Sequence, residues 1–487
     1  MSDLVFTPAH KLALMIRQGE LSAVEVLEAY LEQISRQNPH LNAIVTLDEV
    51  GARKQAQSAD AALKRGEVVG PLHGVPITVK DLLETEGLRT TCGFPPLADY
   101  HPKRDATGVA RLRQAGAVIL GKTNVPALGQ DIQTYNPLFG RTNNPWDLKR
   151  TPGGSTGGGA AAVAAGCSAL DLGSDLGGSL RIPAHFCGVY GFKPTEHRVS
   201  AARTVGEQLG HPRRLRNMLT IGPIARSVED LQLCLSLLEG ADQLHWEVPP
   251  AIQELFNHRP LKDYRLAFTN NFDETPISSE TREALKRVVL RLKEQGCQVE
   301  AASPTSFSFS HAWQTYGEIS SCEMSVSQKG WMRFLTANLG RLLPLERVGP
   351  MVQGVIRGAG YGVQDYLKAL AQRDAFIQQM EDFLSHWDAW LCPVTSGPAF
   401  HHYPKPGIFG SLDVDGKPLP YWVWGTAHTS IFNLTGNPVV VLPFGQTETG
   451  LPIGLQLVGQ RWQDRKLLDL AQKISTAFEP LLHPPEH

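Results

Sequence analysis

The sequence contains no hydrophobic run of about 18 residues, the length that a transmembrane helix needs. The N-terminal segment, MSDLVFTPAHKLALMIRQGE, has no long apolar stretch, so we expect no signal peptide, no integral membrane segment and a cytoplasmic location. There is no cluster of lysine and arginine residues, and the formal net charge is −2 at pH 7. A basic binding surface is therefore not indicated, and we expect no nucleic-acid partner.

Cysteine pairs are also missing. The seven cysteines are scattered, and no two of them form a C-x-x-C motif. This pattern argues against a disulfide framework, a zinc ribbon and a dithiol redox site.

The 487 residues that are present have the composition of an enzyme-sized globular protein, with 42% hydrophobic and 19% charged residues. A capping box from Ser22 to Glu25 precedes a helical periodicity that ends near Pro39. Alternating apolar residues in VPITVK predict a strand that ends at Lys80. Further helices and strands alternate along the chain, which predicts an α/β fold with a mixed or parallel central sheet. The other predicted elements are helices in TGVARLRQAG, TREALKRVVLRLKEQG and DRKLLDLAQKISTAF, and strands in AVILGK, CSALDLGSD, CQVEAA and LPIGLQLVG.

The most unusual run is TPGGSTGGGAAAVAAG, residues 151–166. No lysine follows its glycines as a phosphate-binding P-loop requires, and the preceding NNPWDLKRTP is too polar and proline-broken to be the strand that a dinucleotide-binding loop follows. The run does contain G-x-S-x-G around Ser155, the pattern of a nucleophile elbow. The missing strand, and a candidate base His428 without a carboxylate neighbour, argue against that interpretation. We expect His428 to be a structural histidine with its hydrogen bonds satisfied.

A second glycine-serine turn, GSDLGGSLRIPA, carries Ser179, and Lys80 stands at the end of its predicted strand. An isolated buried lysine loses solvation, so its pKa falls and it can act as a neutral base. Each residue alone also has a structural explanation: a surface charge for Lys80, a helix cap for Ser155 and a turn serine for Ser179.

Taken together, these motifs resemble the amidase signature family from about Leu21 to Phe478. The resemblance rests on NPWDLKRTPGGSTGGGAAAVAAG, LGSDLGGSLRIPAHFCGVYGFKPT, GPLHGVPITVKD and GLPIGLQLVG, and NPLFG is most similar to the fatty acid amide hydrolase branch. It implies an α/β fold whose mixed central sheet is covered by helices on both faces. It also implies one amidase domain over 1–487, with the catalytic motifs in 65–240 and an aromatic-rich pocket wall or lid in 300–425.

The resemblance assigns roles to matching residues. Ser179 matches the nucleophile, Lys80 the general base, and Ser155 a bridging serine preceded by a cis peptide bond. Asp175 and Arg181 are expected to pair and hold the turn. The oxyanion hole matches the backbone amides of Leu176, Gly177, Gly178 and Ser179. The acyl pocket matches Gly129, Gln130 and Asp131. The resemblance implies no metal and no cofactor.

Two functions follow from the resemblance. The first is a free-standing serine hydrolase that cleaves the C–N bond of a small-molecule carboxamide, with apolar acyl or aryl groups favoured by the aromatic-rich region 300–425. The alternative is the amidase (A) subunit of a glutamyl-tRNA amidotransferase complex. That subunit usually reads S-I-R-Q-P-A after the nucleophile, whereas this chain has Ile182 in place of the glutamine, which favours the free hydrolase. Homodimers are usual in the family.

Overall fold

The computed structural model describes residues 4–204, 213, 215–273, 275–326, 330–339, 348–404, 409–479, 481 and 483–487. A central sheet of 11 strands runs through these residues. Its strands, in spatial order, are β1 (Ile44–Leu47), β3 (Val118–Thr123), β2 (Pro76–Lys80), β6 (Leu170–Asp175), β8 (Thr220–Ala225), β7 (Tyr190–Lys193), β14 (Val439–Gln446), β15 (Pro452–Val458), β11 (Ala389–Pro393), β9 (Arg265–Phe268) and β10 (Gln298–Ala301).

The sheet is mixed, as predicted. Strand β2 pairs in parallel with β3 and β6, and β9 pairs in parallel with β10 and β11. The other neighbouring pairs are antiparallel. Parallel neighbours need a crossover, and helices supply it between β2 and β3 and between β9 and β10. Two small hairpins lie outside the sheet: β4 (Tyr135–Asn136) with β5 (Gly140–Arg141), and β12 (Ser411–Val414) with β13 (Lys417–Pro420).

Helices cover both faces of the sheet. Side chains alternate along each strand, so neighbouring residues contact helices on opposite faces. On β6, Leu172 packs next to Gly108 of α4 and Leu238 of α7, whereas Gly173 approaches Thr156 and Leu180 beside α5 and α6. The helices are α1 (Ala9–Gln18), α2 (Ala23–Leu41), α3 (Glu49–Lys64), α4 (Thr107–Gln114), α5 (Gly157–Ala164), α6 (Arg181–Cys187), α7 (Val228–Leu238), α8 (Ser279–Glu294), α9 (Phe309–Ser325), α10 (Gly330–Leu339), α11 (Gly349–Gly358), α12 (Val363–Leu384), α13 (Tyr421–Leu434) and α14 (Asp464–Thr476).

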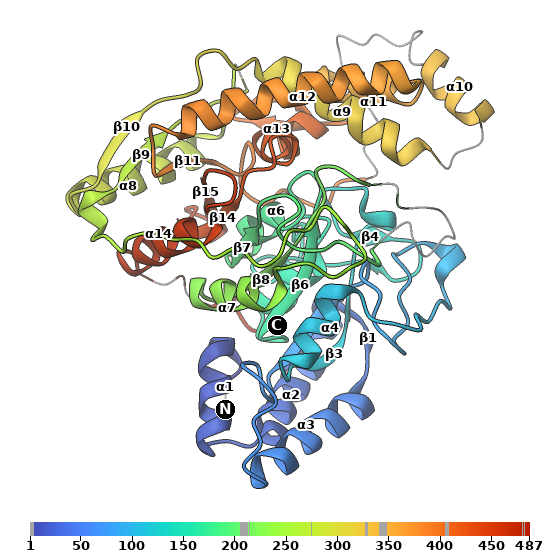
Figure 1. The fold of residues 1–487 in the computed structure, drawn as a ribbon, viewed down its shortest axis with the longest axis vertical. Helices are drawn as coiled ribbons and strands as arrows, with labels where there is room; N and C mark the ends of the chain where they lie inside the picture. Colours follow the sequence, from blue (N-terminus) through green and yellow to red (C-terminus); the bar gives the residue numbers. More distant parts are fainter. Residues whose placement is uncertain are drawn as a thin grey trace.

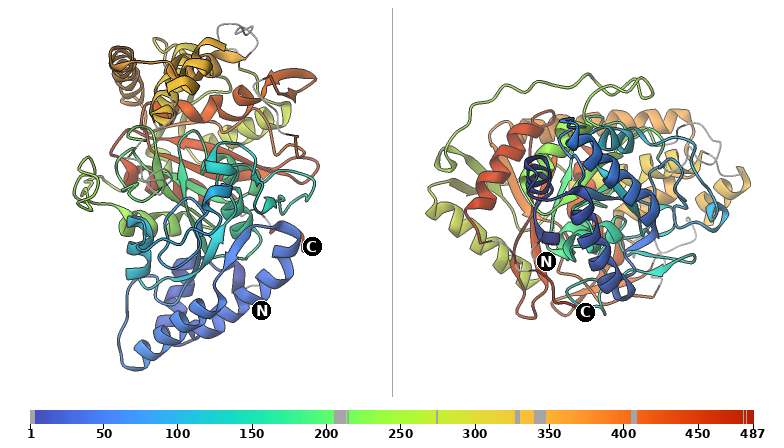
Figure 2. Two further views of the ribbon diagram at one scale, coloured as in Figure 1. Left: turned by 90° about the vertical axis from the view of Figure 1, so that its right-hand side faces the viewer. Right: turned by 90° about the horizontal axis from the view of Figure 1, so that it is seen from below.

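The elements are spread along the long axis of the molecule. Figure 1 shows α1 to α3 at one end and α9 to α12 at the other, with the sheet between them. The left view in Figure 2 shows the same arrangement, and the right view looks along the long axis from below. Within the described residues, no helix has the length and apolar content needed to cross a membrane.

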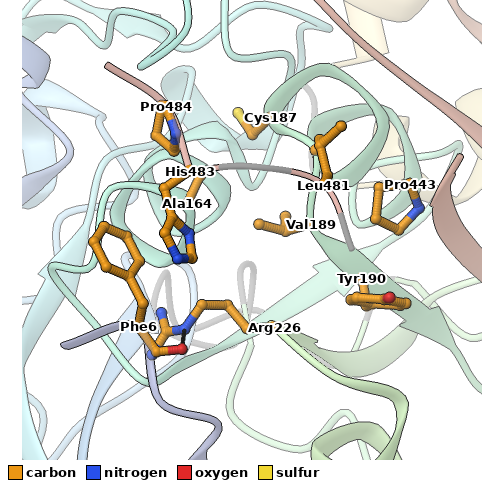
Figure 3. Close-up of a pocket in the computed structure, with 11 residues that line it drawn as sticks. Phe6, Ala164, Cys187, Val189, Tyr190, Arg226, Pro443, Leu481, His483 and Pro484 are labelled. Atoms are coloured by element: carbon orange, nitrogen blue, oxygen red, sulfur yellow. Dashed lines mark hydrogen bonds between the residues drawn. The ribbon is translucent and has the colours of Figure 1, made fainter. Parts of the chain in front are cut away.

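The C-terminal tail returns to the N-terminal end of the chain (Figure 3). The His483 ring stacks on Phe6 with 3.8 Å between ring centroids. Arg226 lines the same pocket, but it donates hydrogen bonds to the backbone carbonyls of Phe6, Val163 and Ser168. These donors therefore join the N-terminal segment to the end of α5 and to the loop before β6.

Most predicted elements are present, with one boundary moved. The capping box forms, because Ser22 Oγ accepts from the Glu25 amide at 3.1 Å and Glu25 accepts from the Ser22 amide at 2.7 Å. Helix α2 continues through Pro39 to Leu41, beyond the predicted end. The region 300–425 contains α9 to α12, and its segments 327–329, 340–347 and 405–408 lie outside the described residues. The division into a motif core and a pocket wall stays a prediction.

Candidate active site

Lys80 ends β2 inside the protein, with none of its side chain exposed. Its Nζ lies 2.8 Å from Ser155 Oγ and 2.8 Å from Thr156 Oγ1. It also lies 3.1 Å from Ser174 Oγ and 3.2 Å from the Ser174 carbonyl. Burial lowers the pKa of Lys80 to about 7, against the opposing charges of Asp175 and Asp171. A large fraction of this amine is therefore neutral near pH 7 and able to accept a proton.

The glycine loop brings Ser155 against this amine. The peptide bond between Gly154 and Ser155 is cis, the conformation that the family resemblance implies. Gly153 has φ +86°, and a Cβ there would lie 3.0 Å from the backbone of Pro183. A Cβ on Gly154 would lie 2.6 Å from the carbonyl oxygen of Asp131. Only glycine leaves room for these approaches, so the loop composition follows from how closely it packs.

Ser179 lies in the turn between β6 and α6 and is half-buried, unlike the fully enclosed Lys80. Its carbonyl accepts a hydrogen bond from the Thr156 amide at 3.1 Å, which joins the two glycine-serine turns. Among the described residues, the hydroxyls of Ser155 and Ser179 make no hydrogen bond to each other. The structure thus brings Lys80 and Ser155 into direct contact and joins the backbone of the more exposed Ser179 to Thr156, the neighbour of Ser155.

A buried ion pair holds the nucleophile turn. Arg181 Nη2 lies 2.8 Å from Asp175 Oδ1, as expected from the sequence, and neither side chain is exposed. Asp175 also accepts from the amides of Gly178 at 2.8 Å and Leu180 at 2.9 Å. Burial alone would raise the pKa of Asp175, but Arg181 and these amides hold it far below its usual range. Asp175 therefore stays ionised and fixes the turn.

The same contact affects the predicted oxyanion hole. The Gly178 N–H points to Asp175 Oδ1 and is already used. The carbonyls of the neighbouring residues are held from the other side: Gly177 accepts from Thr429 Oγ1 at 2.7 Å, and Leu176 accepts from the Tyr316 hydroxyl at 3.1 Å. Leu176 and Gly177 are both half-buried.

Several of these contacts were not predicted from the sequence. Thr429 lies on α13 and Tyr316 on α9, far along the chain from Ser179. Asn433, one helical turn after Thr429, donates to Asp175 Oδ1 at 2.9 Å. The spacing of Thr429 and Asn433 on one helix face is the signal that the sequence offers for them. Thr156, the immediate neighbour of Ser155, was the other residue that could have been found.

The three predicted pocket residues fall in different places. A Cβ on Gly129 would lie 3.4 Å from Ser155 Oγ, so Gly129 borders the reacting groups. Gln130 is exposed, and Asp131 accepts a hydrogen bond from the Tyr421 hydroxyl at 2.6 Å. Both line a pocket of about 580 Å³ with Tyr403. Their part in substrate binding stays a prediction.

His428 is structural in a different way from the one expected. It is fully buried, and its ring lies 5.2 Å from the ring of Phe272, centroid to centroid. Neither ring nitrogen has a hydrogen-bond partner among the described residues, so its polar atoms are not satisfied as predicted. Burial lowers the pKa of His428 to about 3. A ring in this setting has no route to Ser155 as a base.

Comparison with known proteins identifies the family of this chain. The chain matches the amidase family over residues 25–468. It is 35% identical to the A subunit of the glutamyl-tRNA(Gln) amidotransferase from Roseiflexus castenholzii, over 96% of this chain and 97% of that protein. The chain therefore belongs to the amidase (amidase signature) family and is an enzyme that cleaves amide C–N bonds.

Solved structures share the whole fold. An amidase of 30% identity superposes with a TM-score of 0.78 and covers 97% of this chain and 100% of its own. Fatty acid amide hydrolase, at 25% identity, superposes with a TM-score of 0.81 over 99% of this chain and 86% of its own. These likenesses confirm the family and fold predicted from the motifs.

One expectation is wrong. On the grounds of net charge and the lack of a basic cluster, we expected no nucleic-acid partner. The curated relatives that cover nearly the whole chain carry the name of a glutamyl-tRNA(Gln) amidotransferase subunit, which contradicts that expectation. Net charge is a sum over the whole chain and does not report which molecules a protein acts with.

Proposed function

We propose that this chain cleaves the C–N bond of a carboxamide through an acyl-enzyme on Ser179, with Lys80 as general base and Ser155 as proton relay. The observation that carries this proposal is the 2.8 Å contact between a fully buried Lys80 Nζ and Ser155 Oγ. A serine hydroxyl is a poor nucleophile without a base, and a lysine whose pKa is lowered to about 7 can supply one.

The proposed proton path runs from the half-buried Ser179 through Ser155 to the fully buried Lys80. Neutral Lys80 accepts the Ser155 proton, and Ser155 accepts the Ser179 proton as Ser179 Oγ bonds to the amide carbon. The relay then returns a proton to the leaving nitrogen as the C–N bond breaks. Water afterwards attacks the acyl ester and releases the acid, so that Ser179 regains its proton. The Ser155–Ser179 hydrogen bond forms in this scheme when substrate fills the opening, since catalytic contacts commonly tighten in the complex.

Three backbone amides remain to stabilise the oxyanion. Because Asp175 uses the Gly178 N–H, the donors in our proposal are those of Leu176, Gly177 and Ser179. Tyr316 holds the Leu176 carbonyl, which fixes the direction of the Gly177 N–H in the same peptide. Thr429 holds the Gly177 carbonyl, whose peptide carries the Gly178 N–H that Asp175 accepts from. Loss of one such donor typically costs about 2.7–4 kcal/mol.

Covalent labelling tests the assignment. A fluorophosphonate probe followed by peptide mass spectrometry should place the adduct on Ser179, and Ser179→Ala should remove it. The matched control is Ser236→Ala, a serine on α7 that donates to the Leu233 carbonyl at 2.7 Å and takes no part in the proposed proton path; this variant should keep the adduct on Ser179. An adduct on Ser155 would restore the nucleophile-elbow interpretation and overturn the proposed roles.

For the biological reaction, we infer that the chain acts as the amidase (A) subunit of a glutamyl-tRNA amidotransferase. Relatives of that name are 32–35% identical over most of their length, which supports this inference. An amidotransferase moves an amide nitrogen, so the substrate is a primary carboxamide and the leaving group is ammonia. The purified chain should release ammonia from glutamine or asparagine slowly, and the remaining subunits with tRNA should accelerate it.

A free-standing amidase is the second candidate. Ile182 favours it, because this buried residue packs in an apolar cluster beside the nucleophile turn where the amidotransferase motif carries glutamine. This candidate predicts rapid release of amine from apolar anilides by the purified chain alone. A panel of primary amides and anilides, assayed with and without the partner subunits and with Ser179→Ala as blank, separates the two.

A further inference from the structure

A second polar group lies on the same face of the sheet as Lys80. Parallel pairing puts Thr78 opposite Asp171 on β6, and Lys80 opposite Thr123 on β3. Residues opposite one another share a face, and so do residues two apart on one strand. Asp171 therefore stands on the face that carries Lys80 and receives the glycine loop.

Asp171 is fully buried and only partly satisfied. Its Oδ1 accepts from Thr78 Oγ1 at 2.7 Å and from Thr123 Oγ1 at 3.0 Å. Its Oδ2 has no hydrogen-bond partner among the described residues. The first turn of α5 covers it so closely that a Cβ on Gly159 would lie 2.1 Å from Oδ2. A buried carboxylate is costly, and neither an ion pair nor full hydrogen bonding explains this one.

We propose that Asp171 is a positioning residue for the reaction: its negative charge, held on the Lys80 face by Thr78 and Thr123, sets the pH above which Lys80 can act as a base. The inference rests on the proposed function, in which Lys80 must be neutral. It adds a role for a residue that touches neither substrate nor Ser179.

The direction of the effect follows from the charges around Lys80. Asp171 and Asp175 both come from β6, and both raise the pKa of Lys80 against the larger effect of burial. The other polar groups that face the amine are hydroxyls and one carbonyl, from Ser155, Thr156 and Ser174. Lys122 points to the opposite face of β3, and its charge lowers the pKa of Asp171, as that of Lys80 does. Asp175 has the larger effect on Lys80, but it stays ionised beside Arg181, so only the effect of Asp171 changes as the pH falls.

Asp171 titrates in the same range as the lysine. Burial raises the pKa of Asp171 to about 6, although Thr78 and Thr123 donate to it. At neutral pH it is an anion that favours the ammonium form of Lys80. Removing the charge should therefore make Lys80 neutral at lower pH.

The test is the pH dependence of Ser179 labelling by a fluorophosphonate, which needs no knowledge of the substrate. For the unchanged chain we expect the rate to fall on the acid side near pH 7. Asp171→Asn keeps the shape of the side chain and should move this acid limb by about one unit to lower pH. The matched control is Asp230→Asn, a buried carboxylate that accepts the Ala9 amide at 3.0 Å and is not among the groups that shift Lys80.

A second variant tests the same effect in case Asp171→Asn does not fold. Thr123→Val removes one donor to Asp171, which raises the pKa of that acid, and it should shift the limb in the same direction by a smaller amount. A limb that stays in place or moves to higher pH in the folded variants overturns the role of Asp171. If the unchanged chain shows no acid limb, or Lys80→Met is labelled as fast as the unchanged chain, the proposed function itself fails.

Discussion

Two buried lysines on neighbouring strands point to opposite faces of the sheet and contact different partners. Lys80 on β2 and Lys122 on β3 are both fully buried, and their segments, PITVK and VILGK, look alike. The parallel register pairs Lys80 with Thr123 and Val79 with Lys122, so the two lysines point to opposite faces. On its face, Lys122 donates to Thr85 Oγ1 at 2.7 Å and to the Leu83 carbonyl.

The difference lies in their partners. Burial lowers the pKa of Lys122 to about 8, with the charge of Asp81 as the largest opposing effect. Lys80 instead meets Ser155, whose hydroxyl can pass a proton towards Ser179. Burial and a lowered pKa therefore do not make a lysine a base. A catalytic lysine also needs a neighbour that leads to the reacting atoms.

The largest expected effect comes from removing each lysine in turn. Lys80→Met should lower kcat/KM by about 10²–10⁴-fold, the usual contribution of a general base. Lys122→Met should keep kcat/KM within about threefold but lower stability by roughly 1–3 kcal/mol, since it leaves buried acceptors unpaired. Steady-state kinetics and denaturant unfolding of both variants measure this. Equal losses of activity would erase the distinction between the two faces.

Removing the relay should come next in size. Ser155→Ala leaves Lys80 without its path to Ser179, and we expect about a 10²-fold loss of kcat/KM, towards the low end of general-base effects. The KM should change little, because Ser155 is only 3% exposed and so offers little surface to a bound substrate. Unimpaired turnover in Ser155→Ala would mean that Lys80 reaches Ser179 by another route.

The pH profile should report Lys80 and not Lys122. With a pKa near 7, Lys80 gains a proton as the pH falls, so kcat/KM should drop about tenfold per pH unit well below pH 7. Lys122→Met should leave this limb in place. A rate that stays flat down to about pH 4 would contradict a lysine base.

Stability should follow pH through both lysines. Their pKa values in the folded chain lie below the ordinary 10.5, so the unfolded chain binds more protons between about pH 7 and 10.5. Each lysine should therefore make the free energy of unfolding rise with pH across this window, whereas buried cysteines such as Cys92 and Cys234, whose pKa values burial raises, act in the opposite direction above about pH 9. Relative to the unchanged chain, the free energy of unfolding of Lys122→Met should rise less above about pH 8. Urea unfolding at a series of pH values tests this, and an unchanged slope would count against a neutral Lys122.

The smallest effects should come from removing one hydroxyl partner of each lysine. Thr156→Val removes one 2.8 Å contact of Lys80 but leaves Ser155, and should reduce kcat/KM by up to about tenfold, since one neutral hydrogen bond is worth about 0.5–1.5 kcal/mol. Thr85→Val removes the matching contact of Lys122 and should lower only stability, by a similar free energy. Loss of activity in Thr85→Val with an intact fold would show that the two faces are coupled.

Much of the fold could be predicted from local patterns. The capping box at Ser22, the strand that ends at Lys80 and the helix that ends before Gly296 depend on neighbours within one or two turns, and all are present. The end of α2 was placed too early because Pro39 does not end the helix. The helix continues to Leu41, and Asn42 caps it in a left-handed conformation. Boundaries of this kind depend on packing as well as propensity.

The sequence by itself determined the family, the alternation of strands and helices, and the two glycine-serine turns with their lysine. These are encoded in motifs and short-range periodicity. Only the tertiary structure decided that Lys80 and Lys122 face opposite ways, that Asp175 uses the Gly178 amide, and that Thr429 and Tyr316 support the turn. Apart from the short-range contact between Asp175 and Gly178, these facts relate residues far apart in the chain. Strand register and helix packing, which no local pattern records, decide which of them meet.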